Sequence, residues 1–231
     1  MKLPLLISVP HAGVEIPDEV KDICILSRKN IVEDGDVGAS EIYDFGDNFE
    51  HYFITKIARA IVDLNRAEDD FRKDGIIKTH TCWDMPVYSK FPSATLINKL
   101  IETCWRPYHM NLTANANKNA ILGIDCHTMA SIGPPVGPDH GNPRPWICLS
   151  NGDGETCPDD WMERLRLCFE KEFGPRNVAV NDPFKGGYIT RTHGKEMPWV
   201  QLEVSRGNFF PNHQKRERIL SALNSWCAQF P

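Results

Sequence analysis

Short apolar runs alternate with stretches of helical periodicity along almost the whole chain, and this alternation limits the fold more than any other feature. The apolar runs end in Pro, Gly or Asp, and they cover residues 3–9, 52–57, 59–64, 120–125, 146–149, 177–180 and 199–204. The pattern predicts an α/β protein in which helices pack on the faces of a sheet.

Helical spacing of apolar residues is clearest in three segments, 93–112, 159 or 160 to 173, and 213–229. Pro107 should kink or break the first helix, because proline lacks the N–H group and clashes with the preceding turn. Gly174 should stop the second helix. The Gly- and Pro-rich stretch 133–145 is expected to form a long loop within a single domain that spans 1–231.

Charge and cysteine content indicate which partners the protein can bind and in which cellular compartment it is expected. The 26 Lys and Arg against 31 Asp and Glu give a net charge of −5 without a clustered basic stripe, so nucleic acid is not an expected partner. The 8 cysteines form no CxxC pair, which favours a reducing compartment. The apolar start of the chain meets polar residues within ten positions, too soon for a signal peptide or a membrane span, and we expect a cytoplasmic protein.

Two histidines follow apolar strands directly. His11 leaves the first strand in Ser8-Val9-Pro10-His11, and His127 follows the strand that ends at Asp125. Open α/β sheets bind their ligands at such strand ends, and imidazole is a standard zinc ligand. The pair therefore points to a shared metal, with Asp125 able to orient a ring, although each histidine alone could simply cap a loop.

A catalytic zinc site usually has a third protein ligand, and several carboxylates are candidates. Glu15 stands four residues after His11, but Gly13 and Pro17 make a helix there improbable. Asp34 and Asp36 open the next helical stretch and could reach the same strand end, or could serve as ordinary helix caps. Residue spacing alone leaves this choice open.

The strand at 199–205 carries a carboxylate in its interior. Strand alternation puts Val200 and its apolar neighbours on one face and Gln201 and Glu203 on the other. Burying Glu203 is costly unless it is paired or lies near a metal. The alternative is an edge strand with one solvated face.

Two further segments could bind substrate. Arg66, at the end of Asp63-Leu64-Asn65-Arg66, could grip a carboxylate with two parallel hydrogen bonds, and the Gly186-Gly187 turn would let backbone approach a ligand closely. The phosphate-loop spacing and the Gly-x-Ser-x-Gly elbow are both missing from the sequence, so neither a P-loop protein nor a serine hydrolase is indicated.

An ordered set of short motifs resembles the N-formylglutamate amidohydrolase family. In chain order they are Ser-Val-Pro-His-Ala-Gly, Asp-Gly-Asp followed by Ile42-Tyr43, Asp-Leu-Asn-Arg, Arg-Pro-Tyr-His, Asp-Cys-His-Thr-Met, Asn-Asp-Pro-Phe-Lys-Gly-Gly-Tyr-Ile-Thr and Gln-Leu-Glu-Val-Ser-Arg. The resemblance extends from about residue 5 to 212. The family is in turn similar to zinc carboxypeptidases and aspartoacylases, which implies a three-layer sandwich with a central mixed sheet, like that of zinc exopeptidases.

The resemblance also assigns roles to residues. It implies a metal held by His11, Asp36 and His127. Val14 departs from the carboxypeptidase pattern His-x-x-Glu, and Asp36 is favoured over Glu15 because the Asp-Gly-Asp before Ile42-Tyr43 belongs to the family motif whereas Glu15 does not. It implies Glu203 as general base and acid. The substrate clamp it implies is Asn65 with Arg66, and Arg66 is also counted as catalytic. Tyr188 and Arg191 are further candidates for substrate binding, and Arg206 is an alternative clamp.

The implied activity is zinc-dependent hydrolysis of an N-acyl amide. One zinc, or another divalent metal, is expected per chain. The expected partner is a small N-acyl amino acid such as N-formylglutamate, cleaved to formate and the free amino acid. A zinc peptidase, a cell-wall amidase and a non-catalytic binding protein with the same fold are the alternatives, and the sequence leaves the acyl group, the amino acid and the oligomeric state open.

Overall fold

A computed structural model describes residues 2–134 and 139–230, and six strands within them form one sheet in the order β2-β1-β3-β6-β4-β5. The strands are β1 (Leu3–Val9), β2 (Phe49–Ile54), β3 (Leu122–Met129), β4 (Ile147–Ser150), β5 (Val178–Val180) and β6 (Trp199–Ser205). All neighbours pair in parallel except β4 and β6, which pair antiparallel. The sheet is therefore mixed, as the family resemblance implies.

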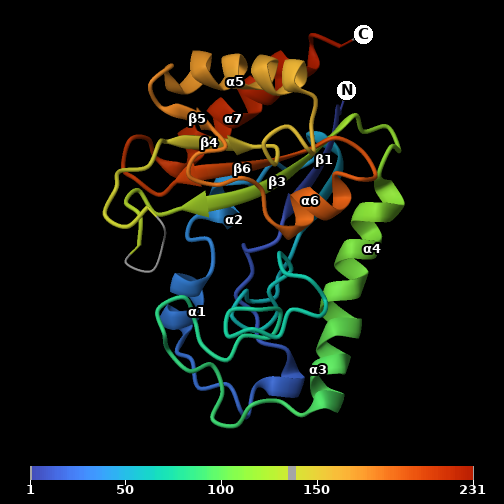
Figure 1. Ribbon diagram of the computed structural model, residues 1–231, viewed down its shortest axis with the longest axis vertical. Helices are drawn as coiled ribbons and strands as arrows, with labels where there is room; N and C mark the ends of the chain where they lie inside the picture. The colour runs from blue at the N-terminus through green and yellow to red at the C-terminus, as the bar shows by residue number, and fades with distance from the viewer. Residues whose placement is uncertain (1, 135–138, 231) are drawn as a thin grey trace.

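Helices cover both faces of this sheet. They are α1 (Arg28–Asp34), α2 (Ala39–Ile42), α3 (Ala94–Leu100), α4 (Arg106–Asn115), α5 (Asp159–Phe173), α6 (Tyr188–His193) and α7 (Asn212–Cys227), with short turns η1 (Asp18–Val20) and η2 (Ile101–Trp105). Figure 1 shows α5 and α7 above the sheet and α4 and α6 on its other side. The predicted three-layer α/β architecture is confirmed.

The two faces of the sheet differ in chemistry. One face is apolar and packs against α5 and α7 in the main core, and it comprises Leu5, Ile7, Val9, Leu122, Ile124, Cys126, Val200, Leu202 and Val204. The opposite face is also buried. It includes the apolar Leu6 and Trp199, but it presents the polar side chains of Ser8, Asp125, His127, Gln201 and Glu203. One face thus holds the helical layer in place, and the other carries the candidate site.

A second apolar cluster lies in the lower half of Figure 1, where α1 and α3 are found. It gathers Ile61, Val62, Ile76 and Leu100, all with almost no exposed surface. Because this cluster buries the long connection between β2 and α3, it gives a firm support to the segment that carries Asn65 and Arg66.

Most predicted elements are confirmed, one expectation is wrong, and one is met only in part. Residues 59–64 form a turn, in which the Ile61 and Val62 N–H groups donate to Ala58 O, and their burial in the second cluster explains the strand-like pattern. Of the kink or break expected at Pro107, the break is absent: helical backbone continues from 94 to 115, but the regular α-helix is interrupted by the wider π-helical turn η2 directly before α4, which holds the proline in its first turn.

Smaller differences concern the ends of elements. The strand expected at 52–57 begins and ends three residues earlier, whereas α5 has the predicted bounds, and its C-cap Gly174 donates to Glu170 O. Of the loop expected at 133–145, residues 135–138 lie outside the described residues. Among the helices that the structure describes, none is both long and apolar enough to cross a membrane.

Candidate active site

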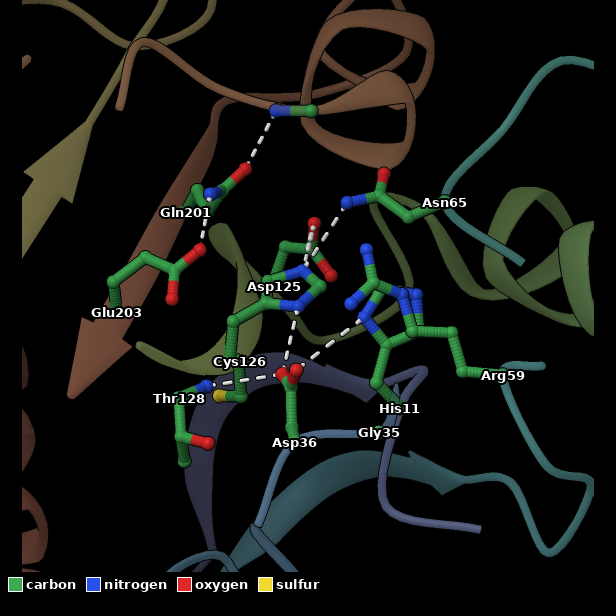
Figure 2. A network of polar contacts seen from close by, with 12 residues as sticks. His11, Gly35, Asp36, Arg59, Asn65, Asp125, Cys126, Thr128, Gln201 and Glu203 are labelled. Carbon is green, nitrogen blue, oxygen red and sulfur yellow. Dashed lines mark hydrogen bonds and ion pairs between the residues drawn. The ribbon is translucent and has the colours of Figure 1, made fainter. Parts of the chain in front are cut away.

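His11, Asp36 and His127 converge on one buried point, and their donor atoms all lie within 4.8 Å of one another. Figure 2 labels His11 and Asp36 at this point. His11 follows β1, His127 lies in β3, and Asp36 lies between α1 and α2, where its N–H donates to His11 O. Asp36 Oδ2 is 3.1 Å from His127 Nδ1, and Asp36 Oδ1 is 3.8 Å from His11 Nδ1. The Asp36 position is further fixed by a 3.0 Å bond from Thr128 N–H.

Each histidine is oriented by a buried carboxylate on its far nitrogen. His11 Nε2 lies 2.8 Å from Asp63 Oδ1, and His127 Nε2 lies 3.0 Å from Asp125 Oδ2. Because a carboxylate accepts, both Nε2 atoms carry a proton, and both Nδ1 atoms face the common point. Paired carboxylates of this kind orient histidine ligands in metal sites. The donor set of two ring nitrogens and one carboxylate fits a divalent metal such as zinc.

Two cations, the buried Lys78 and the partly exposed Arg59, contact the Asp63 carboxylate that binds His11. Asp63 is 3.1 Å from Arg59 Nε and 3.6 Å from Lys78 Nζ, and Lys78 also donates to Asp34 at 3.0 Å. Burial opposes ionisation of Asp63, but the charges of His11, Arg59 and Lys78 hold its pKa well below the usual range. Asp34 is therefore engaged in this ion-pair cluster and is not part of the group around His11 and His127.

The electrostatics of the three converging residues favour a cation among them. Burial lowers the pKa of His11, although the neighbouring Asp63 opposes this shift. Burial also opposes a charge on His127, but Asp125 and Asp36 on its two sides raise its pKa well above the ordinary value. The pKa of Asp36 is lowered despite its burial, because of the hydrogen bond to His127 and the charges of both histidines. A positive charge is thus stabilised between these carboxylates, as a metal site requires.

Glu203 lies beside His127 in the register of β6 and β3 and has 7% of its surface exposed. Because β6 runs between β3 and β4, the edge-strand alternative is wrong. Burial and the charges of Asp36 and Asp125 raise the pKa of Glu203 to about 7. A carboxyl group with a pKa near neutrality can both accept and release a proton, which is what general acid–base catalysis needs.

Asn65 lies beside His127 and belongs to the connection between β2 and α3. Its Nδ2 lies 3.3 Å from His127 Nε2, and its Oδ1 accepts a 2.8 Å bond from Ile189 N–H. A Cβ added to Gly187 would lie 2.3 Å from Asn65 Nδ2. The close backbone approach expected at this glycine pair therefore accommodates the Asn65 amide.

The loop that carries Asn65 is held by the helix of the Arg-Pro-Tyr-His motif. His109 Nε2 donates to Leu64 O at 2.9 Å, and Trp105 Nε1 donates to Arg66 O at 2.9 Å. Tyr188 packs its ring against the Trp105 and His109 rings. The structure thus places Tyr188 in a supporting contact beside the site.

The three arginines proposed to bind substrate, Arg66, Arg191 and Arg206, differ in whether they contact the group of His11, Asp36 and His127. Arg66 donates to Asp74 O and Asn65 O, and Arg191 donates to Glu155 and Gly186 O at the surface. Among the described residues, neither guanidinium has a hydrogen bond to the converging group. Arg206 does approach it, with Nη2 3.6 Å from Asp36 Oδ1 and Nε donating to Thr128 Oγ1.

Fold and site together define a class. A mixed α/β sheet with two histidines and a carboxylate converging near its strand ends, and a separate buried glutamate on the same face, is typical of metal-dependent hydrolases. The sequence model of the N-formylglutamate amidohydrolase family matches residues 3–209. The chain belongs to this family, so the predicted membership is confirmed.

Individual relatives agree with this membership. The chain is 27% identical to an N-formylglutamate deformylase of Pseudomonas putida, over 99% of this chain and 95% of that protein. It is 29% identical to an N-formylglutamate deformylase of Pseudomonas aeruginosa, over 89% and 81%. The crystal structure of an N-formylglutamate amidohydrolase from Ralstonia eutropha JMP134 matches with a TM-score of 0.76 at 18% identity, over 98% of this chain and 91% of that one, which shows a shared fold.

Proposed function

We propose that this protein is an N-formylglutamate amidohydrolase that uses one divalent metal, zinc by preference, in a single catalytic domain. The observation that carries the proposal is the buried convergence of His11, Asp36 and His127 on the sheet face that also presents Glu203. The names of the relatives support the substrate, and the donor set supports zinc. The reaction is hydrolysis of the formyl amide to formate and glutamate.

The chain's own residues have separate tasks in this reaction. A divalent metal bound by His11, Asp36 and His127 would act as a Lewis acid on the scissile carbonyl and make water reactive near neutral pH. Glu203 takes a proton from the attacking water and passes it to the nitrogen of the leaving amine. Asp63 and Asp125 keep both histidine rings in place while this happens. The bond that breaks is the amide C–N bond, and the proton from water goes to the amine.

Substrate binding is proposed for the loop at 65–66 and the segment at 188–191. Asn65 is placed beside His127, and Arg66 follows it with a half-buried guanidinium next to Asp74. We propose that Arg66 binds a carboxylate of the substrate, with Tyr188 and Arg191 completing the binding surface. Location in the cytoplasm is our proposal as well, and the eight free cysteines suit that reducing compartment.

The activity is tested with the purified, metal-loaded protein and N-formyl-L-glutamate. Formate and glutamate should appear in equal amounts, and N-formyl-L-glutamine should be hydrolysed less efficiently because it lacks the side-chain charge. Cleavage of peptides or muramoyl amides, with no release of formate from N-formylglutamate, would instead favour the peptidase or cell-wall amidase alternatives. A protein that binds N-formylglutamate without turnover would favour the non-catalytic alternative.

Asp36→Ala should remove most of the bound metal, whereas Glu15→Ala should keep it. Asp36 lies between the two histidines, while Glu15 is exposed and its backbone is paired with the segment at 56–58. Elemental analysis of both variants, purified without chelators, checks this expectation. Loss of metal in the Glu15 variant alone would reverse the assignment.

Arg66→Lys should raise KM for N-formylglutamate about tenfold or more, because lysine cannot reproduce the planar, two-pronged grip on a carboxylate. Steady-state kinetics of Arg66→Lys and Arg206→Lys, side by side, locate the clamp. An Arg66 variant with normal KM next to an impaired Arg206 variant would move the substrate carboxylate to Arg206.

A further inference from the structure

Gln201 connects Glu203 to the segment that precedes α6 (Figure 2). It lies two residues before Glu203 on the same face of β6 and is buried. Its Oε1 accepts a 2.5 Å hydrogen bond from Gly187 N–H, and its Nε2 donates a 2.9 Å hydrogen bond to Glu203 Oε1. Both ends of the Gln201 amide are therefore engaged.

The orientation of this amide follows from its partners. A backbone N–H can only donate, so the Gln201 oxygen must face Gly187 and the nitrogen must face Glu203. Gly187 itself cannot shift toward Asn65, since the Asn65 amide already fills the space of a Cβ there, and Ile189 N–H binds the same Asn65. The group that holds Gln201 is thus the Gly187 N–H, whose backbone is packed against Asn65.

This arrangement distinguishes the two oxygens of Glu203. Oε1 accepts from Gln201, while Oε2 has no hydrogen-bond partner within residues 2–134 and 139–230. An amide neither takes up nor releases a proton at neutral pH. A proton from water can therefore go to Oε2 alone without disturbing the hydrogen bond that fixes the carboxylate.

We propose that Gln201 is a positioning residue, which holds the Glu203 carboxylate in the geometry for proton transfer and leaves Oε2 free to receive the proton. This inference rests on the proposed function, in which Glu203 is the general base. It adds a dependence of the base on the Gly187 backbone, so that the substrate-binding segment and the base move together.

Two substitutions at position 201 separate this role from simple support of the loop. Gln201→Leu removes both hydrogen bonds, whereas Gln201→Glu keeps an acceptor for Gly187 N–H and puts a second carboxylate in place of the donor that faces Glu203. We expect both variants to lose about 10- to 100-fold in kcat, with KM changed less than about threefold and the bound metal retained. If Gln201 only supported the loop, Gln201→Leu would raise KM for N-formylglutamate more than about threefold and leave kcat near the wild-type value.

Ser150→Ala is the matched control. Ser150 is the register partner of Gln201 in β4, is equally buried, and donates to Phe184 O, with no hydrogen bond to Glu203 in the described chain. It should keep kcat within about threefold. An equal loss in the Ser150 variant would show that kcat responds to any change in this layer, which would overturn the inference.

A double-mutant cycle gives the decisive kinetic result. Because Gln201 is proposed to act through Glu203, Gln201→Leu should cost less than about twofold when added to Glu203→Gln. A full additional loss in that background would overturn the inference. If the wild-type protein shows no hydrolysis of N-formylglutamate, the proposed function fails, and crystal structures then decide the positioning itself. Glu203 should leave its position in the Gln201→Leu variant, and an unmoved carboxylate would overturn the inference.

Discussion

Glu203→Gln should lower kcat for N-formylglutamate at least about 10²-fold while the protein keeps its metal and its fold. Glutamine has the shape of glutamate but cannot accept the proton of the attacking water. Glu203 lies on the polar face of the sheet and is not one of the three converging residues, so its charge is not needed to hold a metal. Steady-state kinetics, elemental analysis and thermal unfolding of the purified variant check the three parts of this expectation.

The control for this variant is Glu217→Gln, on the exposed side of α7 in the helical layer that covers the apolar face of the sheet. It makes the same chemical change away from the site and should leave kcat unchanged. Normal turnover in the Glu203 variant would contradict its role as the base. Loss of the metal in that variant would make Glu203 a ligand, and the base would then have to be another carboxylate.

Local sequence patterns predict the strand-borne part of the site well. The period of two places Glu203 and Gln201 opposite Val200, and the ends of apolar runs mark His11 and His127, because both signals depend only on neighbouring residues. The choice between Asp36 and Glu15 as the third metal ligand cannot be made from neighbouring residues. It depends on how the chain returns from α1, where the Asp36 N–H binds His11 O, and only the family resemblance favoured Asp36 in advance.

The charged support behind His11 could not be predicted from local patterns. Lys78 and Arg59 resemble surface residues in the sequence, yet Lys78 is 1% exposed and both contact Asp63. The turn at 59–64 has the composition of a strand because it is buried in a separate apolar cluster. Both features arise from packing between segments distant in the chain, which propensity and periodicity do not encode.

The hydrogen bonds of Arg66 and Arg191 show a related limit. A sequence can indicate that an arginine follows a strand. The direction of its long side chain, however, depends on which hydrogen-bond acceptors lie nearby in the folded protein. Arg191 finds Glu155 and Gly186 O, and Arg206 instead approaches Asp36. The substrate clamp is therefore better decided by kinetics of matched lysine variants than by motif position.

Loss of the metal is the second change expected to have a large effect on activity. His127→Ala tests it by removing one of the three proposed ligands. The His213→Ala variant serves as control, because His213 is exposed on α7 and lies outside the converging group. It should bind the same amount of metal as the wild-type protein and keep its activity. Wild-type protein treated with a chelator should lose activity and regain it when zinc is added.

His127→Ala should lose both the metal and the activity, with turnover reduced at least about 10³-fold, because a bound metal contributes several kcal/mol to a hydrolytic transition state. The same change leaves Asp36 and Asp125 buried without the ring between them, so the free energy of unfolding should fall as well. Adding zinc should raise the Tm of the wild-type protein, since a ligand that binds the folded state stabilises it, and should leave the Tm of the variant unchanged. Elemental analysis separates the two effects: a folded His127→Ala variant with a full complement of zinc would place the metal at another site.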